Sequence, residues 1–166
     1  YGTQNATAML LWNKGRDGKW YCIREYYYSG RESGRQRTDS QYADDLKKFL
    51  NGTRVRAVIV DPSAASFIAE LRKRGYAVLK GKNDVLDGIR LVATLLNTGM
   101  IVFSDECKNT VKEFASYVWD SKAADRGEDE PVKQHDHAMD AVRYFCYTVL
   151  NNQTVRIKDK TKCGFY

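Results

Sequence analysis

The segment "VRAVIVD", from Val55 to Asp61, decides the fold class of this 166-residue chain. It is a nearly continuous run of β-branched and apolar residues, which is the pattern of a strand buried on both faces. The segment 63–75 has an amphipathic helical period and ends at a glycine, and another short apolar run covers 76–80. A strand, a helix and a second strand in this order predict a right-handed parallel crossover.

The rest of the chain extends this unit in both directions. Two aromatic-rich strands, 6–14 and 19–28, are joined by the turn sequence "GRDG", which predicts an antiparallel pair. The further elements that we expect are a short strand within 31–38, helices at 38–51, 83–98 (N-capped by Asn83), 105–119 and 136–150, and a strand at 99–104. This order predicts an α/β domain over 1–152, with a mixed sheet and helices on its faces, followed by a basic tail at 153–166.

The amino-acid composition indicates a folded protein and argues against a zinc-binding or membrane-spanning one. Hydrophobic residues make up 43% of the chain, enough for a folded core. The net charge of +6 suits a polyanionic partner such as nucleic acid, although such a charge also serves solubility alone. The four cysteines form no CxxC pair, which argues against a structural zinc site. No apolar run is long enough for a membrane span.

Asp61 is the first candidate for chemistry. It follows the buried strand directly, and ligands of α/β sheets bind outside the carboxyl ends of parallel strands. A carboxylate in this position suits a metal ion. The alternative is that Asp61 caps the following helix or begins a turn with Pro62.

The last helix carries the second candidate pair. His137 and Asp140 are one turn apart, on a face that continues through Ala141 and Tyr144, whereas the apolar stripe lies elsewhere. An exposed His–Asp pair would contribute only about 0.3 kcal/mol to the helix, and that is the alternative interpretation. Mg²⁺ and Mn²⁺ prefer oxygen ligands, which Asp61 and Asp140 would supply. Further acidic candidates, by residue type only, are Asp84, Asp87 and Asp105.

Three segments in this order resemble the nuclease domain of the large terminase subunit of tailed bacteriophages. They are "YGTQNATAMLLW" at 1–12, "VIVDPSAASFIAELRKRG" at 58–75 and "DHAMDAVRY" at 136–144. The resemblance implies a ribonuclease H-like fold, with a mixed five-stranded sheet and helices on both faces. It also implies an endonuclease that cuts double-stranded concatemeric DNA with two Mg²⁺ or Mn²⁺ ions, about 4 Å apart.

The resemblance also assigns roles to residues. Asp61 and Asp140 match the second and third metal ligands, and His137 matches a histidine that orients a water or passes a proton. The first metal-binding aspartate would stand immediately before Tyr1, outside this chain, so we expect the chain alone to be impaired. Phosphates would be held by basic residues. The basic residues in question are Arg31, Arg35, Arg37, Lys80 and Lys82. A separate hypothesis concerns the charged loop 120–134, which directly precedes the last helix and would gate access to the site.

The partners implied are double-stranded DNA, an ATPase domain of the same polypeptide, the portal protein and the small terminase subunit, at the procapsid in the host bacterial cytoplasm. Two alternatives stay open. One is a ribonuclease H-like resolvase or a nuclease for RNA–DNA hybrids. The other is a non-catalytic DNA-binding module, which gains weight if the residue before Tyr1 is not Asp.

Overall fold

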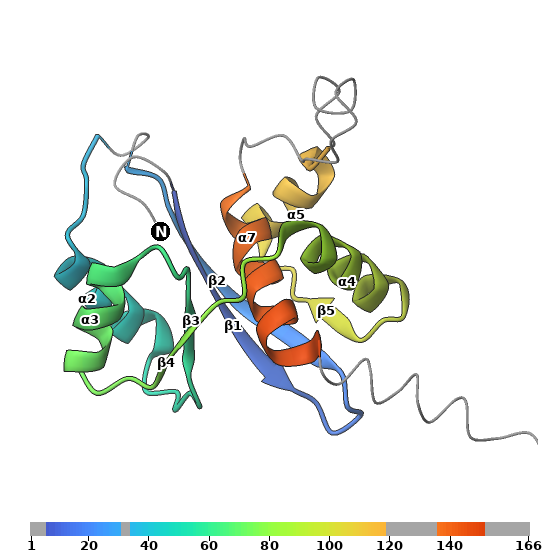
Figure 1. The fold of residues 1–166 in the computed structure, drawn as a ribbon, viewed down its shortest axis with the longest axis horizontal. Helices are drawn as coiled ribbons and strands as arrows, with labels where there is room; N and C mark the ends of the chain where they lie inside the picture. Colours follow the sequence, from blue (N-terminus) through green and yellow to red (C-terminus); the bar gives the residue numbers. More distant parts are fainter. Residues whose placement is uncertain (1–5, 31–33, 119–135, 152–166) are drawn as a thin grey trace, which may run out of the picture.

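A computed structural model describes residues 6–30, 34–118 and 136–151. Its elements follow the predicted order of strands and helices (Figure 1). They are β1 (Thr7–Lys14), β2 (Trp20–Tyr28), α2 (Asp39–Leu50), β3 (Val58–Val60), α3 (Ala65–Lys73), β4 (Val78–Lys80), α4 (Val85–Asn97), β5 (Ile101–Phe103), α5 (Lys108–Ser116), α7 (His137–Phe145) and a π-helical turn, η1 (Cys146–Leu150). None of the described helices has the length and apolar character needed to cross a bilayer.

The strands confirm the mixed α/β fold. β1 and β2 form an antiparallel hairpin, and β5 adds to β2 in the parallel sense. β3 and β4 pair in parallel, as the crossover through α3 requires. Within the described residues the five strands are therefore hydrogen-bonded as three plus two.

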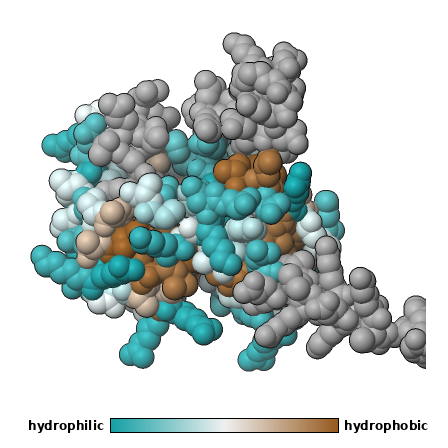
Figure 2. All heavy atoms as spheres, viewed as in Figure 1, coloured by the Kyte–Doolittle hydropathy of each residue, from teal (hydrophilic) through white to brown (hydrophobic). Residues whose placement is uncertain are grey.

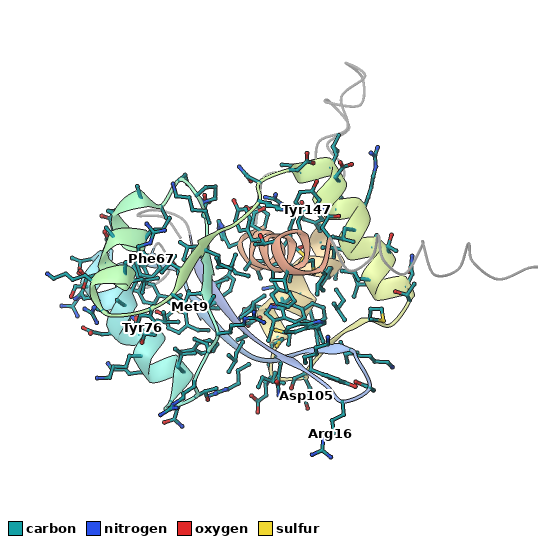
Figure 3. The ribbon with its side chains drawn as sticks, turned by 60° about the horizontal axis from the view of Figure 1, so that its bottom comes forward. Met9, Arg16, Phe67, Tyr76, Asp105 and Tyr147 are labelled. Carbon is teal, nitrogen blue, oxygen red and sulfur yellow. The ribbon has the colours of Figure 1, made fainter. Side chains whose placement is uncertain are left out.

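Helices cover both faces of the strands, because alternate residues of β1 enter two different cores. Met9 and Leu11 pack with α2 and α3, whereas Leu10 and Trp12 pack with α4 and α7. The first core also contains Phe67 and Tyr76, which point toward Met9 in Figure 3. Figure 1 shows the same division, with α2 and α3 on one side of the β1–β2 hairpin and α4, α5 and α7 on the other.

A β-bulge in β2 changes which side chains face α5 and α7. The register passes from Leu11↔Arg24 to Trp12↔Cys22, so Ile23 has no partner on β1. The extra residue reverses the alternation along β2. As a result, Cys22 on one side of the bulge and Glu25 on the other both contact residues of α5 or its N-cap.

Three local features differ from the predictions. In the described part of the segment 31–38, residues 34–38 form no strand, and Thr38 caps α2 through a reciprocal capping box with Gln41. The N-cap of α4 is Asp84, not Asn83. In the helix predicted at 105–119, the apolar period of Val111, Phe114 and Val118 predicts that Val111 faces inward. The exposed fraction of Val111 is 53%, because Thr110 and Glu113 take the buried positions.

The predictions for the loop 120–134 and the tail 153–166 lie outside the described residues.

On the visible surface, hydrophobic residues gather over β3 and β4 (Figure 2).

Candidate active-site cleft

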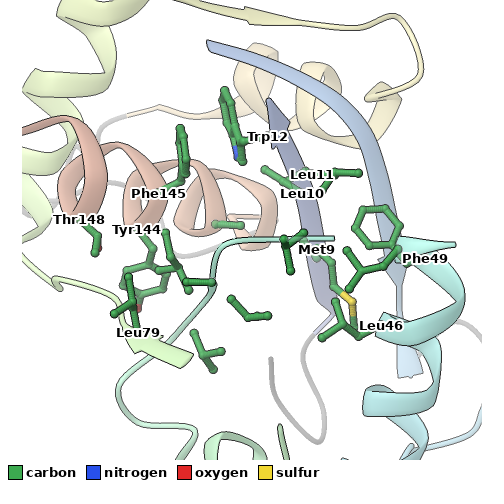
Figure 4. A pocket seen from close by; sticks show the side chains of 18 of the residues that line it. Met9, Leu10, Leu11, Trp12, Leu46, Phe49, Leu79, Tyr144, Phe145 and Thr148 are labelled. Carbon is green, nitrogen blue, oxygen red and sulfur yellow. The ribbon is translucent and has the colours of Figure 1, made fainter. Parts of the chain in front are cut away.

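A cleft of about 1410 Å³ lies between β1, α2, β3 and one face of α7 (Figure 4). Much of its lining is apolar, including Leu46 and Phe49 of α2. The three residues that the sequence analysis singled out, Asp61, His137 and Asp140, all line it. Asp61 enters from the end of β3, and the other two come from the first turn of α7. The fold therefore brings residues far apart in the sequence to one cleft.

The apolar side of α7 fixes which face of the helix meets the cleft. The Phe145 ring stacks on Trp12 with ring centroids 4.3 Å apart and meets Trp20 edge-on at 5.1 Å. Ala138 and Val142 are also buried, as the predicted apolar stripe requires. With that stripe against the sheet, Tyr144 and the other residues of the polar face line the cleft.

Asp61 is held in a turn by the chain that follows it. Its Oδ1 accepts hydrogen bonds from the Ser63 amide at 2.8 Å and the Ser63 hydroxyl at 2.7 Å. Burial acts to raise the pKa of Asp61, but these bonds and the Tyr144 hydroxyl outweigh it, so the pKa lies below its usual value. The N-cap position of α3 belongs to Ala64. Asp61 is thus an ionised carboxylate at the strand end.

Tyr144 lies in the cleft beside Asp61. Its hydroxyl donates to Asn83 Oδ1 at 3.2 Å and also interacts with Asp61. Burial, followed by the negative charges of Asp61 and Asp140, raises the pKa of Tyr144, so the hydroxyl keeps its proton. The ring approaches the backbone at Gly81, where a Cβ would lie 2.7 Å from a ring carbon.

Arg143 was not among the predicted site residues, yet it fixes Asp140. Its Nη2 donates to Asp140 Oδ1 at 2.7 Å, and its Nη1 donates to the Asp84 carbonyl at 3.2 Å. The Arg143 side chain is 5% exposed and the Asp140 side chain 38%. A Cβ on Gly88 of α4 would lie 2.6 Å from Arg143 Cγ. The sequence feature that could have indicated this contact is Gly88 itself, because a glycine inside a predicted helix often marks a close approach by another element.

His137 lies at the start of α7 and lines the cleft beside Asp136. Its Nδ1 is 3.7 Å from Asp136 Oδ1, and its side chain is 22% exposed. The imidazole therefore has partial access to the cleft from a helix N-terminus.

The basic residues of the cleft differ from those predicted. Arg37 stacks on Tyr28 and pairs with Asp45, so it holds α2 to the hairpin. Arg31 lies outside the described residues, and Arg35, Lys80 and Lys82 are absent from the cleft lining. Among the described residues, the cations that line the cleft are Lys14, Arg54 and Arg56.

The further acidic candidates lie elsewhere. Asp84 caps α4, and Asp87 pairs with Arg90 on the same helix. Asp105 is exposed after β5, toward the end of the molecule that carries Arg16 (Figure 3). Within the part of the chain that the structure describes, no three His, Cys, Asp or Glu residues are grouped closely enough to hold a metal ion. The aspartates that line the cleft are Asp61, Asp136 and Asp140.

Comparison with known proteins places this chain in a family. Residues 3–147 match the family described as "Terminase RNaseH-like domain". The chain belongs to this family. The large terminase subunit of Escherichia phage T5 is 26% identical over 152 residues, which cover 89% of this chain and 34% of that protein.

Solved structures agree with this assignment. The large terminase of a thermophilic bacteriophage is 57% identical, with a TM-score of 0.88, over 90% of this chain and 38% of that one. The nuclease domain of the bacteriophage SPP1 large terminase, determined with bound Mn, has the same fold at 19% identity and a TM-score of 0.62, over 89% of this chain and 81% of that one. The chain thus spans little more than a third of the phage T5 protein and of the thermophilic phage protein.

Proposed function

We propose that this chain is the metal-dependent endonuclease domain of a phage DNA-packaging terminase and cuts double-stranded concatemeric DNA by a two-metal mechanism. The observation that supports the proposal is that Asp61 and Asp140 line the same cleft. Both carboxylates act on the Tyr144 hydroxyl, although they come from separate elements. Membership of the terminase family supports the same activity.

The donor chemistry of the cleft suits a hard divalent cation. Asp61 and Asp140 offer carboxylate oxygens, the ligands that Mg²⁺ and Mn²⁺ prefer. The resemblance adds a third carboxylate immediately before Tyr1, beside the segment that leads into β1. Two bound ions would supply electrostatic stabilisation of the charge that develops on the phosphate. The Mn-bound SPP1 nuclease domain supports this choice of metal.

The remaining cleft residues would bind the DNA phosphates and help to activate a water molecule. Arg54 and Arg56 are exposed at the cleft and would hold phosphates without reading base sequence. His137, which lines the cleft, would orient a water or accept its proton, because imidazole nitrogens can both donate and accept hydrogen bonds. Arg143 would hold the Asp140 side chain in place through its hydrogen bond to Oδ1.

The partners follow from the longer relatives. The large terminase of the thermophilic phage has been solved with ADP, and this chain covers 38% of it. We therefore place an ATPase domain in the remainder of the full polypeptide. Contacts with the portal protein and the small subunit, at the procapsid in the host cytoplasm, belong to the same proposal.

A plasmid-nicking assay tests the proposal. The chain, extended upstream through the residue before Tyr1, is incubated with supercoiled DNA and Mn²⁺. We expect nicking by the parent, and none by Asp61→Asn or Asp140→Asn. Asp105→Asn is the matched control, because Asp105 also follows a strand but does not line the cleft. Equal nicking by all four proteins would reject the proposed site.

A second candidate is DNA binding without cleavage. One observation favours it: among the described residues, no three His, Cys, Asp or Glu side chains are grouped closely enough to hold a metal ion. Retained duplex binding with no cleavage by the extended chain would favour it. Faster cleavage of four-way junctions or RNA–DNA hybrids than of linear duplex would instead indicate a resolvase or hybrid nuclease.

A further inference from the structure

The first turn of α7 is capped by a carboxylate from another helix. An N-cap side chain normally accepts hydrogen bonds from the second and third amides of its helix. The N-cap residue of α7, Asp136, makes no such bond. Glu113 of α5 takes its place, because Glu113 Oε2 accepts from the amides of Ala138 at 2.7 Å and Met139 at 3.2 Å.

The same arrangement occurs one element earlier. The N-cap residue of α5, Cys107, makes no side-chain cap bond either. Glu25 of β2 accepts instead from the amides of Asn109 at 3.0 Å and Thr110 at 2.6 Å. Helix α5 is therefore fixed to β2 by a carboxylate, just as α7 is fixed to α5.

Strand β2 also reaches Glu113 directly. The Tyr27 hydroxyl donates to Glu113 Oε1 at 2.8 Å, so both oxygens of this carboxylate accept hydrogen bonds. Glu25 and Tyr27 are two residues apart on one face of β2. Strand β2 thus contacts both Glu113, which caps α7, and the N-terminus of α5, the helix that carries Glu113.

The Glu113 side chain is buried, and its carboxylate contacts protein donors and not solvent. It is 4% exposed, and a buried carboxylate is costly unless its oxygens are hydrogen-bonded. Burial raises the pKa of Glu113, whereas the bonds from Tyr27, Ala138 and Met139 act against that rise. The positive end of the α7 dipole adds a favourable interaction with the carboxylate.

We propose that Glu113 is a positioning residue for the nuclease site: its carboxylate fixes the first turn of α7 and thereby places His137 and Asp140 opposite Asp61. The proposal rests on the proposed nuclease function. His137 is the first residue of α7 and Asp140 lies one turn on, so both sit on the turn whose amides Glu113 holds. Glu25 acts through Glu113 by setting the N-terminus of α5.

The test compares Glu113→Gln with the wild-type extended chain. The amide side chain has nearly the same shape but carries no charge and only one acceptor oxygen. We expect amide hydrogen exchange at Ala138 and Met139 to become faster by about 2- to 30-fold, the range that loss of a helix cap corresponds to. Exchange in α2 and α3 should not change. The matched control is Glu106→Gln, because Glu106 is exposed and lies just before α5.

Nicking kinetics give the second readout. We expect Glu113→Gln to lower kcat for plasmid nicking about tenfold, with KM for DNA unchanged, because the basic residues of the cleft are not altered. Unchanged exchange in α7, a uniform rise in exchange over the whole chain, or faster exchange with unchanged kcat would each overturn the proposal. A wild-type chain that cuts no DNA would contradict the nuclease function alone, and the exchange comparison would still decide whether Glu113 holds α7.

Discussion

Nη2 of Arg143 lies 2.7 Å from Oδ1 of Asp140, and the same guanidinium stacks over the Tyr144 ring with its central carbon 4.8 Å from the ring centroid. One buried cation therefore touches both an acidic residue of the cleft and the tyrosine that faces Asp61. It also donates to the Asp84 carbonyl, which joins the start of α4 to α7. The orientation of the candidate ligand Asp140 depends on how Arg143 packs.

Replacing Arg143 with lysine should destabilise the fold. A guanidinium donates in two directions here, to Asp140 and to the Asp84 carbonyl, whereas one ammonium cannot reach both. We expect Arg143→Lys to lower the free energy of unfolding by about 1–3 kcal/mol, measured by urea denaturation. Arg90→Lys is the control, because Arg90 is 69% exposed and its pairing with Asp87 is loose. Equal stabilities of the two variants would contradict the role of Arg143.

Gly88→Ala tests the close approach of α4 to α7. Helix propensity alone would make alanine more stable than glycine by about 1 kcal/mol. The added Cβ would lie 2.6 Å from Arg143 Cγ, however, and Arg143 is too deeply buried to move aside. We expect a net loss of about 1–3 kcal/mol in urea denaturation. If Gly88→Ala were more stable than the wild type, the close contact between Gly88 of α4 and Arg143 of α7 would be contradicted.

The basic residues of the cleft should govern DNA affinity. Arg54 and Arg56 line the cleft, whereas Arg90 does not. We expect Arg54→Gln and Arg56→Gln each to weaken duplex binding and to reduce the slope of log K against log salt by about one. Arg90→Gln should leave both quantities unchanged. Fluorescence anisotropy over a range of salt concentrations measures them, and an equal effect of all three changes would argue against a phosphate path through the cleft.

The buried thiols should be unreactive in the native protein. Burial raises the pKa of Cys146 to about 12 and also raises the pKa of Cys22. Because the thiolate is the nucleophile, both thiols stay protonated at about pH 8 and should react slowly with iodoacetamide. Unfolding in urea should bring labelling to the rate of free cysteine. Peptide mapping after timed labelling checks this, and rapid native labelling of either residue would contradict its burial.

The strand and helix order could be predicted because it depends on local patterns. The apolar stripe through Val142 is buried as expected, whereas the predicted strand at 55–61 forms only at Val58–Val60 and is partly exposed. Asp61 was identified by its place after a buried strand, and it lines the cleft. These features follow from side-chain periodicity, which needs no knowledge of distant partners.

Other features depend on partners that are distant in the sequence. Val111 looked apolar and inward, yet Glu113 takes the buried position because three donors, from β2 and α7, satisfy its carboxylate. Arg143 is buried for a similar reason, since Asp140 and the backbone of Asp84 accept its protons.

The sequence by itself thus determined the α/β order and the face of the last helix that carries His137 and Asp140. Only the tertiary structure decided which charged groups are buried and which helix ends they hold. The physical reason is that a buried charge is tolerated only where donors or acceptors from other elements converge on it.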